Sequence, residues 1–120
     1  MGAVFFMISA MLVLSFGQTI TAQDQVAGKK IYLTYCSGCH GESGKGDGPA
    51  AASLPVKPAD HTDGQIMSKH SDQYLFDIIA KGGQGVQKSS LMPAWNGQLK
   101  EKEIREVIAF IRSLAKASKQ

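Results

Sequence analysis

The segment Cys36-Ser37-Gly38-Cys39-His40 contains the only two cysteines of the 120-residue sequence. Two cysteines separated by two residues and followed directly by a histidine have the spacing of a covalent haem attachment site. Each sulfur can form a thioether bond to a vinyl group on one edge of the porphyrin, and the histidine can then reach the iron. The segment therefore predicts one covalent haem c bound through Cys36 and Cys39, with His40 as an axial ligand.

Three other interpretations of the cysteine pair stay open at this point. A redox-active dithiol is expected within a βαβ unit, and no strand pattern follows the pair. A structural zinc site needs four ligands, and the remaining histidines, His61 and His70, do not form a second paired cluster. A plain disulfide is the third alternative. The adjacent histidine favours haem over all three.

Residues 1–22 contain no Lys, Arg, Asp or Glu. The apolar run from Ala3 to Phe16 has the length of a signal-peptide core and is short for a membrane span. Small residues place a cleavage site between Ala22 and Gln23, although the start lacks a basic residue, so an uncleaved N-terminal anchor is the alternative. We expect one domain over residues 23–120, periplasmic or otherwise extracytoplasmic, and associated with a membrane only if the N-terminal segment is uncleaved.

The distribution of charged residues bears on whether the protein binds nucleic acids. The sequence has 13 basic and 10 acidic residues, a formal net charge of +3, and no block of one sign. Interspersed charges of this kind argue against nucleic-acid binding. A domain of this size has little core of its own, so we expect a bound haem to supply much of the apolar interior.

Apolar residues recur at helical spacing in several segments, and no segment shows the alternation of a strand. The pattern predicts an all-α fold with three to four short helices around one haem. The expected helices are Gln25–Tyr35 with Asp24 as N-cap, a short turn at Gln65–Lys69, a helix that starts after the N-cap Ser71 and ends at Gly82-Gly83, and a helix from Glu101 to Lys116 after a poor cap, Lys100.

Two features outside the cysteine motif indicate how a haem would be enclosed. Gly28 lies inside the first expected helix, where it indicates a close crossing with another helix. The glycine-rich segment Gly41–Pro49 is expected to wrap the haem edge. The carbonyl of Pro49 is well placed to accept a hydrogen bond from His40 and so orient its ring. Leu54 and Val56 are expected to cover the haem.

The second axial ligand has four candidates, namely Met67, Met92, His61 and His70. Met92 is favoured because it lies in a late loop, and the following proline disfavours a helix at this position. We expect Met67 to fill space in the core and both histidines to lie at the surface.

These motifs, taken in order, resemble those of the class I cytochrome c family, and closely its small bacterial mono-haem branch, which is related to the haem-carrying subunits of terminal oxidases. The resemblance covers nearly all of residues 26–114. It rests on Cys36–Gly41, Gly46–Pro49, Lys57–Asp60 and Met92–Trp95.

The resemblance implies the cytochrome c fold, thioether bonds at Cys36 and Cys39, His40 as proximal ligand and Met92 as distal ligand. It also implies a Pro49 carbonyl bonded to His40. The helix crossing would join Gly28 and Tyr32 to Val107 and Phe110. The sequence departs from the family pattern at His61, where an aromatic hydrophobe is common, and at Lys100, where a capping residue is common.

If two side chains fill both axial positions, the iron has no place for a substrate. The expected function is therefore one-electron transfer in a respiratory or other redox chain, by a monomer with no catalytic residues that is not an enzyme. Partners would be a quinol-oxidising complex, a dehydrogenase or a terminal oxidase, docked near Lys45, Lys81 and Lys88. Two alternatives remain: a fixed haem subunit of a larger redox enzyme, and a ligand-binding or peroxidatic haem protein with an open iron.

Overall fold

The computed structural model describes residues 19–117, and this part of the chain contains helices and no strands. The all-α prediction is thus confirmed. The elements are α1 (Ala22–Tyr35), α2 (Ser37–His40), η1 (Ala51–Ser53, a 3-10 helix), α3 (Gly64–Met67), α4 (Asp72–Lys81), η2 (Gln84–Val86, also 3-10) and α5 (Glu101–Ala117). The sequence pattern did not predict α2, which is a single turn formed by the haem-attachment motif itself.

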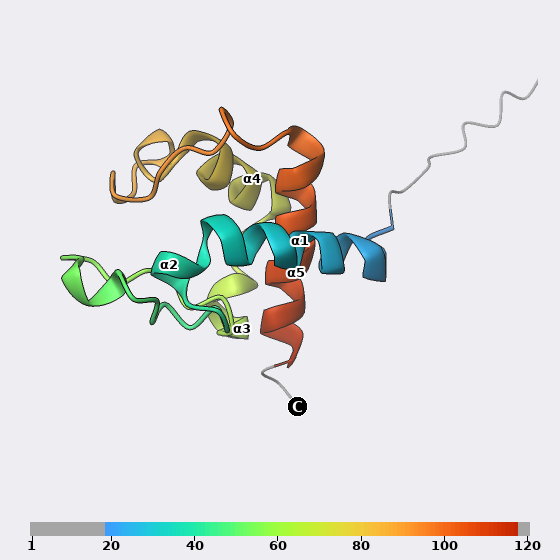
Figure 1. Ribbon diagram of the computed structural model, residues 1–120, viewed down its shortest axis with the longest axis horizontal. Coiled ribbons are helices and arrows are strands. Elements are labelled where there is room, and N and C mark those ends of the chain that lie inside the picture. The colour runs from blue at the N-terminus through green and yellow to red at the C-terminus, as the bar shows by residue number, and fades with distance from the viewer. Residues whose placement is uncertain (1–18, 118–120) are drawn as a thin grey trace, which may run out of the picture.

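The crossing of α1 over α5 organises the fold (Figure 1). A Cβ atom on Gly28 would overlap the backbone carbonyl oxygen of Glu106, so the two helix backbones are in direct contact there. One turn further along α1, Tyr32 is fully buried and its ring meets that of Phe110 edge to face, with 5.1 Å between the centroids. The predicted crossing is therefore confirmed, and only glycine permits it.

The α5 helix buries the apolar stripe that its sequence predicted, including Ile104, Val107 and Ile108. Its weak start at Lys100 is reinforced in a way that the sequence analysis missed. The carboxylate of Glu103 accepts a hydrogen bond from the Lys100 backbone N–H at 2.7 Å, which satisfies one of the free donors at the helix start.

The start of α1 differs from the prediction. Thr21, not Asp24, is the N-cap, and Asp24 is the third residue of the helix. The two form a capping box in which each side chain accepts a hydrogen bond from the backbone of the other residue. Ser71 caps α4 as predicted, through a bond from the Tyr74 N–H to its hydroxyl at 3.0 Å.

Arg112 joins α5 to the segment that connects α3 and α4. Its guanidinium donates to the carbonyl oxygens of Met67 and His70 and, through Nε at 2.9 Å, to the carboxylate of Asp72. These bonds use the fork of donors that arginine alone offers. They fix one side of the space between α5 and α4.

We expect Gly28→Ala to destabilise the folded protein. Helix propensity alone predicts a gain of about 1 kcal/mol for alanine inside a helix. The added methyl group, however, would overlap backbone atoms of α5 that cannot rotate away. We therefore expect a net loss of about 2 kcal/mol in the free energy of unfolding, as for other overpacked interiors, measured by denaturant titration of the haem-loaded protein.

Gly97→Ala is the matched control, because no atom lies within 4 Å of a Cβ built at Gly97. It should change the free energy of unfolding by no more than a few tenths of a kcal/mol, as for other exposed loop positions. A Gly28→Ala protein as stable as the wild type would contradict the backbone contact.

Candidate functional site

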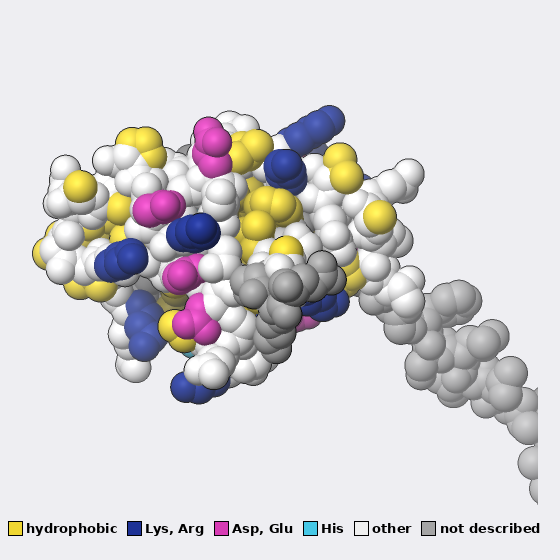
Figure 2. Space-filling model, turned by 90° about the horizontal axis from the view of Figure 1, so that it is seen from below, with side chains coloured by type: hydrophobic (Ala, Val, Ile, Leu, Met, Phe, Trp, Pro, Cys, Tyr) yellow, Lys and Arg dark blue, Asp and Glu magenta, His cyan; other side chains and the backbone are white. Residues whose placement is uncertain are grey.

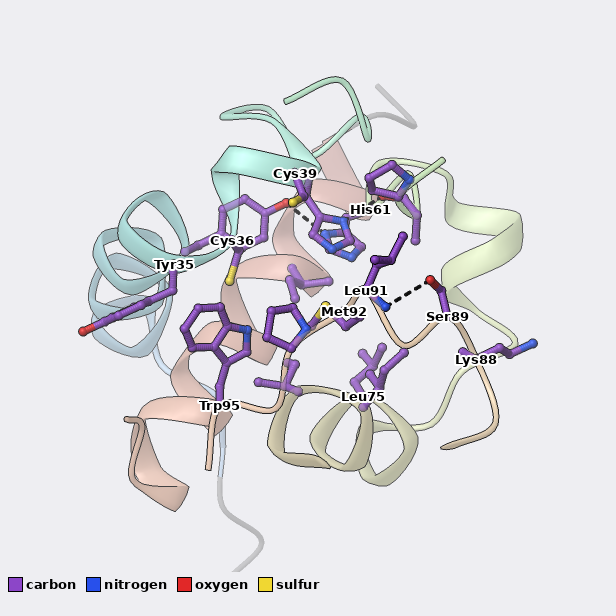
Figure 3. A pocket seen from close by; sticks show the side chains of 18 of the residues that line it. Tyr35, Cys36, Cys39, His61, Leu75, Lys88, Ser89, Leu91, Met92 and Trp95 are labelled. Atoms are coloured by element: carbon purple, nitrogen blue, oxygen red, sulfur yellow. Dashed lines mark hydrogen bonds between the residues drawn. The ribbon is translucent and has the colours of Figure 1, made fainter. Parts of the chain in front are cut away.

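A single cavity brings the predicted site residues together. Its volume is about 370 Å³, and its lining includes Cys36, Cys39, His40 and Met92. Figure 3 shows the two cysteines entering from the α1–α2 side, Leu75 from α4, and Met92 from the loop after η2. Leu54 and Val56 also line it, as predicted. Of the predicted site residues, Pro49 alone is absent from the lining.

The one-turn helix α2 explains why two sulfurs and an imidazole share one wall. Cys36 ends α1 and begins α2, and the His40 N–H donates to the Cys36 carbonyl at 2.9 Å. Residues three apart on a helix lie on the same face, so Cys36 and Cys39 are neighbours. They do not form a disulfide with each other. Burial, followed by the proximity of Cys39, raises the pKa of the Cys36 thiol to about 12.

The ring of His40 is oriented by a backbone carbonyl. Its Nδ1 lies 3.1 Å from the carbonyl oxygen of Ala59. A carbonyl can only accept, so Nδ1 carries the proton and donates. Burial lowers the pKa of His40, with the Ala59 bond acting in the opposite direction, so the ring tends to be neutral. In that form Nε2 has a free lone pair, which is the form of histidine that binds metals.

The predicted bond from His40 to the Pro49 carbonyl is wrong, because Ala59 is the acceptor. Residues 48–50 instead return onto α2: the Gly48 N–H donates to the Cys39 carbonyl at 3.1 Å and the Ala50 N–H to the Gly38 carbonyl at 2.9 Å. The glycine-rich loop therefore closes against the backbone of the motif. The Lys57–Asp60 segment supplies the acceptor in its place.

His61 is buried, contrary to the prediction that it lies at the surface. Only 8% of it is exposed. Its backbone N–H donates to the Gly44 carbonyl at 2.7 Å, and its Nδ1 pairs with the Tyr32 hydroxyl at 2.9 Å. Its ring is stacked on that of His40, with 4.3 Å between centroids and 17° between planes. Burial, and then the nearby His40, lower the pKa of His61 to about 3, so this ring is neutral.

The polar neighbours of His61 in the sequence are the reason why a surface position was predicted for it. Asp60 accepts bonds from the backbone and hydroxyl of Thr62, and Asp63 caps α3. These side chains serve local turns while His61 points inward. The family resemblance held the useful signal, since it places an aromatic hydrophobe at this position. His70 is also not fully exposed, because it lines the cavity and stacks on Tyr74 at 4.4 Å.

Met92 lies on the cavity wall that is formed by the loop after η2. The loop is held to the end of α4 by backbone bonds: Trp95 donates to the Ile79 carbonyl at 2.9 Å, and Asn96 donates to the Ala80 carbonyl at 3.2 Å. Gly83 donates to the carbonyl of Met92 itself at 3.0 Å. Met67, by contrast, is a core residue as predicted, with 2% exposed, although it also borders the cavity.

Gly82 and Gly83 position this loop, a role that the sequence analysis did not assign to them. A Cβ on Gly82 would lie 2.7 Å from the Met92 carbonyl oxygen, and Gly82 has a φ of 76°. A Cβ on Gly83 would overlap the carbonyl of Ser89. The backbone of residues 89–94 therefore lies directly on the glycine pair.

The donor set fits a haem c. Two free thiols lie on one wall next to a neutral imidazole with an available Nε2, and a thioether sulfur comes from a different element. Most of the remaining lining is hydrocarbon, from residues such as Leu75, Ile78 and Ile79. An apolar wall with a few convergent polar atoms is typical of a cofactor site.

The sequence model of the Cytochrome c family matches residues 25–115. Two curated relatives are the Cbb3-type cytochrome c oxidase subunit FixP of Bradyrhizobium diazoefficiens and cytochrome c6 of Anabaena variabilis. FixP is 31% identical over 76% of this chain, but the chain spans only 28% of the length of FixP. Cytochrome c6 is 34% identical over 78% of this chain and 95% of its own length.

Two solved structures share the fold. A chain of the reducing HAO-like protein complex of Kuenenia stuttgartiensis has a TM-score of 0.68 and 29% identity, over 83% of this chain and 47% of that one. The KustC0563 c-type cytochrome has a TM-score of 0.60 over 72% of this chain and 95% of that one, and at 23% identity it supports the fold alone.

The family match covers both walls of the cavity, from α1 through the Met92 loop to α5. The chain therefore belongs to the cytochrome c family, and as a c-type cytochrome it carries covalent haem c.

Proposed function

We propose that the chain is a one-electron carrier in which Cys36 and Cys39 form the thioether bonds and His40 and Met92 bind the iron. When bound, the haem supplies exchange of one electron between ferric and ferrous iron. The observation that supports this site most is the single apolar cavity that receives all four side chains. A histidine–methionine pair raises the potential of a haem, which suits a carrier that receives electrons from a quinol-oxidising complex or a dehydrogenase.

The carrier role excludes catalysis on the iron. With an imidazole on one side and a thioether on the other, no coordination position is left for a substrate, so the chain is not expected to be an enzyme by itself. The likeness to cytochrome c6, which extends over 95% of that protein, supports a free monomeric carrier.

Partner docking would use the open side of the cavity. Of the three lysines expected to take part, Lys88 lines the cavity, whereas Lys81 is paired with Asp77 at 3.3 Å and Lys45 is not part of the lining. The face shown in Figure 2 carries basic and acidic side chains interspersed, without a patch of one sign. Electron-transfer encounters bury little surface and are short-lived, and we propose contacts of this kind with redox proteins, terminal oxidases included.

A fixed haem subunit is the second candidate. It is favoured by the match to FixP, which is an oxidase subunit by name. The two candidates differ in the N-terminal segment. We propose that residues 1–22 direct export and that the domain 23–120 works outside the cytoplasm. Residues 1–18 lie outside the described part of the chain, and none of the described helices is long and apolar enough to span a membrane.

The mass of the protein isolated from its native membrane and extracytoplasmic fractions separates the candidates. A free carrier should be recovered in the extracytoplasmic fraction with Gln23 as its first residue. Cleavage there would remove Thr21 and with it the capping box of α1, at a cost of about 1 kcal/mol in stability. A protein that retains residues 1–22 and stays with the membrane would contradict the free carrier.

Met92→Ala should open the distal side of the iron. We expect the oxidised protein to lose the weak thioether-to-iron band at the red end of its visible spectrum. The midpoint potential should fall because the soft sulfur no longer favours ferrous iron, and the reduced protein should bind carbon monoxide rapidly. The thioether bonds should survive, so haem remains attached after denaturation.

Met67→Leu is the matched control, since Met67 is the other methionine at the cavity and belongs to the core. It should keep the band. A Met92→Ala protein with the wild-type band and potential would contradict the ligand assignment. A wild-type protein that lacks the band and binds carbon monoxide would contradict the carrier proposal itself.

Gly83→Ala should displace Met92 without changing the methionine side chain itself. The added methyl group would overlap the Ser89 carbonyl, so the loop has to move away from α4 and Met92 moves with it. We expect a weakened thioether-to-iron band and faster carbon monoxide binding, with haem content unchanged. Gly97→Ala, in open space, should leave the spectrum unaltered. Identical spectra for the two variants would show that the glycine pair does not position Met92.

A further inference from the structure

We propose that His61 is a positioning residue for the proximal ligand: its ring, held by Tyr32, sets the orientation of the His40 imidazole plane. The inference rests on the proposed binding of iron by His40. It concerns the rotation of that ring about its Cβ–Cγ bond, which neither the attachment motif nor the Ala59 bond determines by itself.

The contact between the two rings is extensive. The imidazole of His61 lies nearly parallel to that of His40, at 17° and 4.3 Å between centroids. A flat group in this position blocks rotation of the His40 ring, because any turn drives an edge into the neighbouring face. The Ala59 carbonyl holds the Nδ1 edge of the same ring at 3.1 Å. The acceptor and the stacked ring are two residues apart on one segment, so they restrain His40 together.

His61 can act in this way because it is itself fixed. Its main chain is bound to Gly44, and its Nδ1 meets the hydroxyl of Tyr32 at 2.9 Å. Tyr32 is fully buried, and its ring packs edge to face on that of Phe110 in α5. A continuous set of contacts thus runs from the α1–α5 crossing through Tyr32 and His61 to His40.

The choice of a polar ring has a physical reason. A buried polar atom without a hydrogen-bond partner destabilises the folded state, and here the Tyr32 hydroxyl and the His61 imidazole are each other's partner. An aliphatic side chain at position 61 could fill the same space but has no plane to align with that of His40. The histidine therefore supplies an oriented face and is anchored through its edge.

The sharpest test removes both polar atoms first and then varies only the ring. Tyr32→Phe/His61→Phe keeps a flat group against His40, and Tyr32→Phe/His61→Leu does not. In ferric haem proteins the order and spread of the four haem methyl resonances in the proton NMR spectrum depend on the orientation of the axial ligand planes. We expect the phenylalanine pair to keep the wild-type order of these resonances and the leucine pair to change it.

Equal methyl patterns in the two double variants would overturn the inference. The single variant Tyr32→Phe tests the anchor. Unlike the phenylalanine pair, it leaves the buried His61 imidazole without its hydrogen-bond partner, so the ring should shift and change the pattern in the same sense as the leucine pair, by a smaller amount. A wild-type pattern in Tyr32→Phe would overturn the anchoring role of the hydroxyl. Retention of covalent haem and of the thioether-to-iron band in all variants shows that the proposed ligands remain in place, so failure of the inference is distinguishable from failure of the proposed function.

Discussion

The contact of the α1 backbone at Gly28 with the α5 backbone at Glu106 is the constraint on which the other features depend. The attachment motif follows α1 directly, so the crossing sets where the two sulfurs and the His40 imidazole lie. The same α5 helix carries Arg112, which ties down the segment between α3 and α4. The positions of both sides of the cavity thus depend on the same pair of helices. In this way a fold with a small core of its own acquires a defined cofactor site.

The two sides are built from different kinds of interaction. On the side of His40, packed rings and a buried hydrogen bond join Tyr32, His61 and His40. On the side of Met92, main-chain bonds to the end of α4 and the close fit of Gly82 and Gly83 hold the loop in place. A buried polar pair is compatible with an apolar cavity because each member satisfies the other.

Much of this could be predicted from the sequence, because the informative patterns are local. Helical periodicity, the attachment motif and the glycine inside the first helix each concern residues close in the chain. The errors at the site concern contacts between distant segments. Pro49 is itself a proline, and Ala59 directly follows one. Nothing in the sequence of either loop tells which of the two carbonyl groups lies next to His40. His61 sits among polar residues that serve local turns, and only its fully buried partner, Tyr32, 29 residues away, explains its inward position.

The loop that carries Met92 is held mainly by main-chain bonds to the end of α4. This has a consequence for fluctuations of the folded state. Opening the segment 84–95 breaks a few main-chain bonds at the end of α4, whereas releasing His40 breaks its contacts with Ala59 and His61, which is itself bonded to the buried Tyr32. Local unfolding free energies follow such differences in buried contact. The folded ensemble therefore includes conformers in which the methionine side is uncovered while the histidine side is intact, and amide exchange would proceed first along the loop and last at the helix crossing.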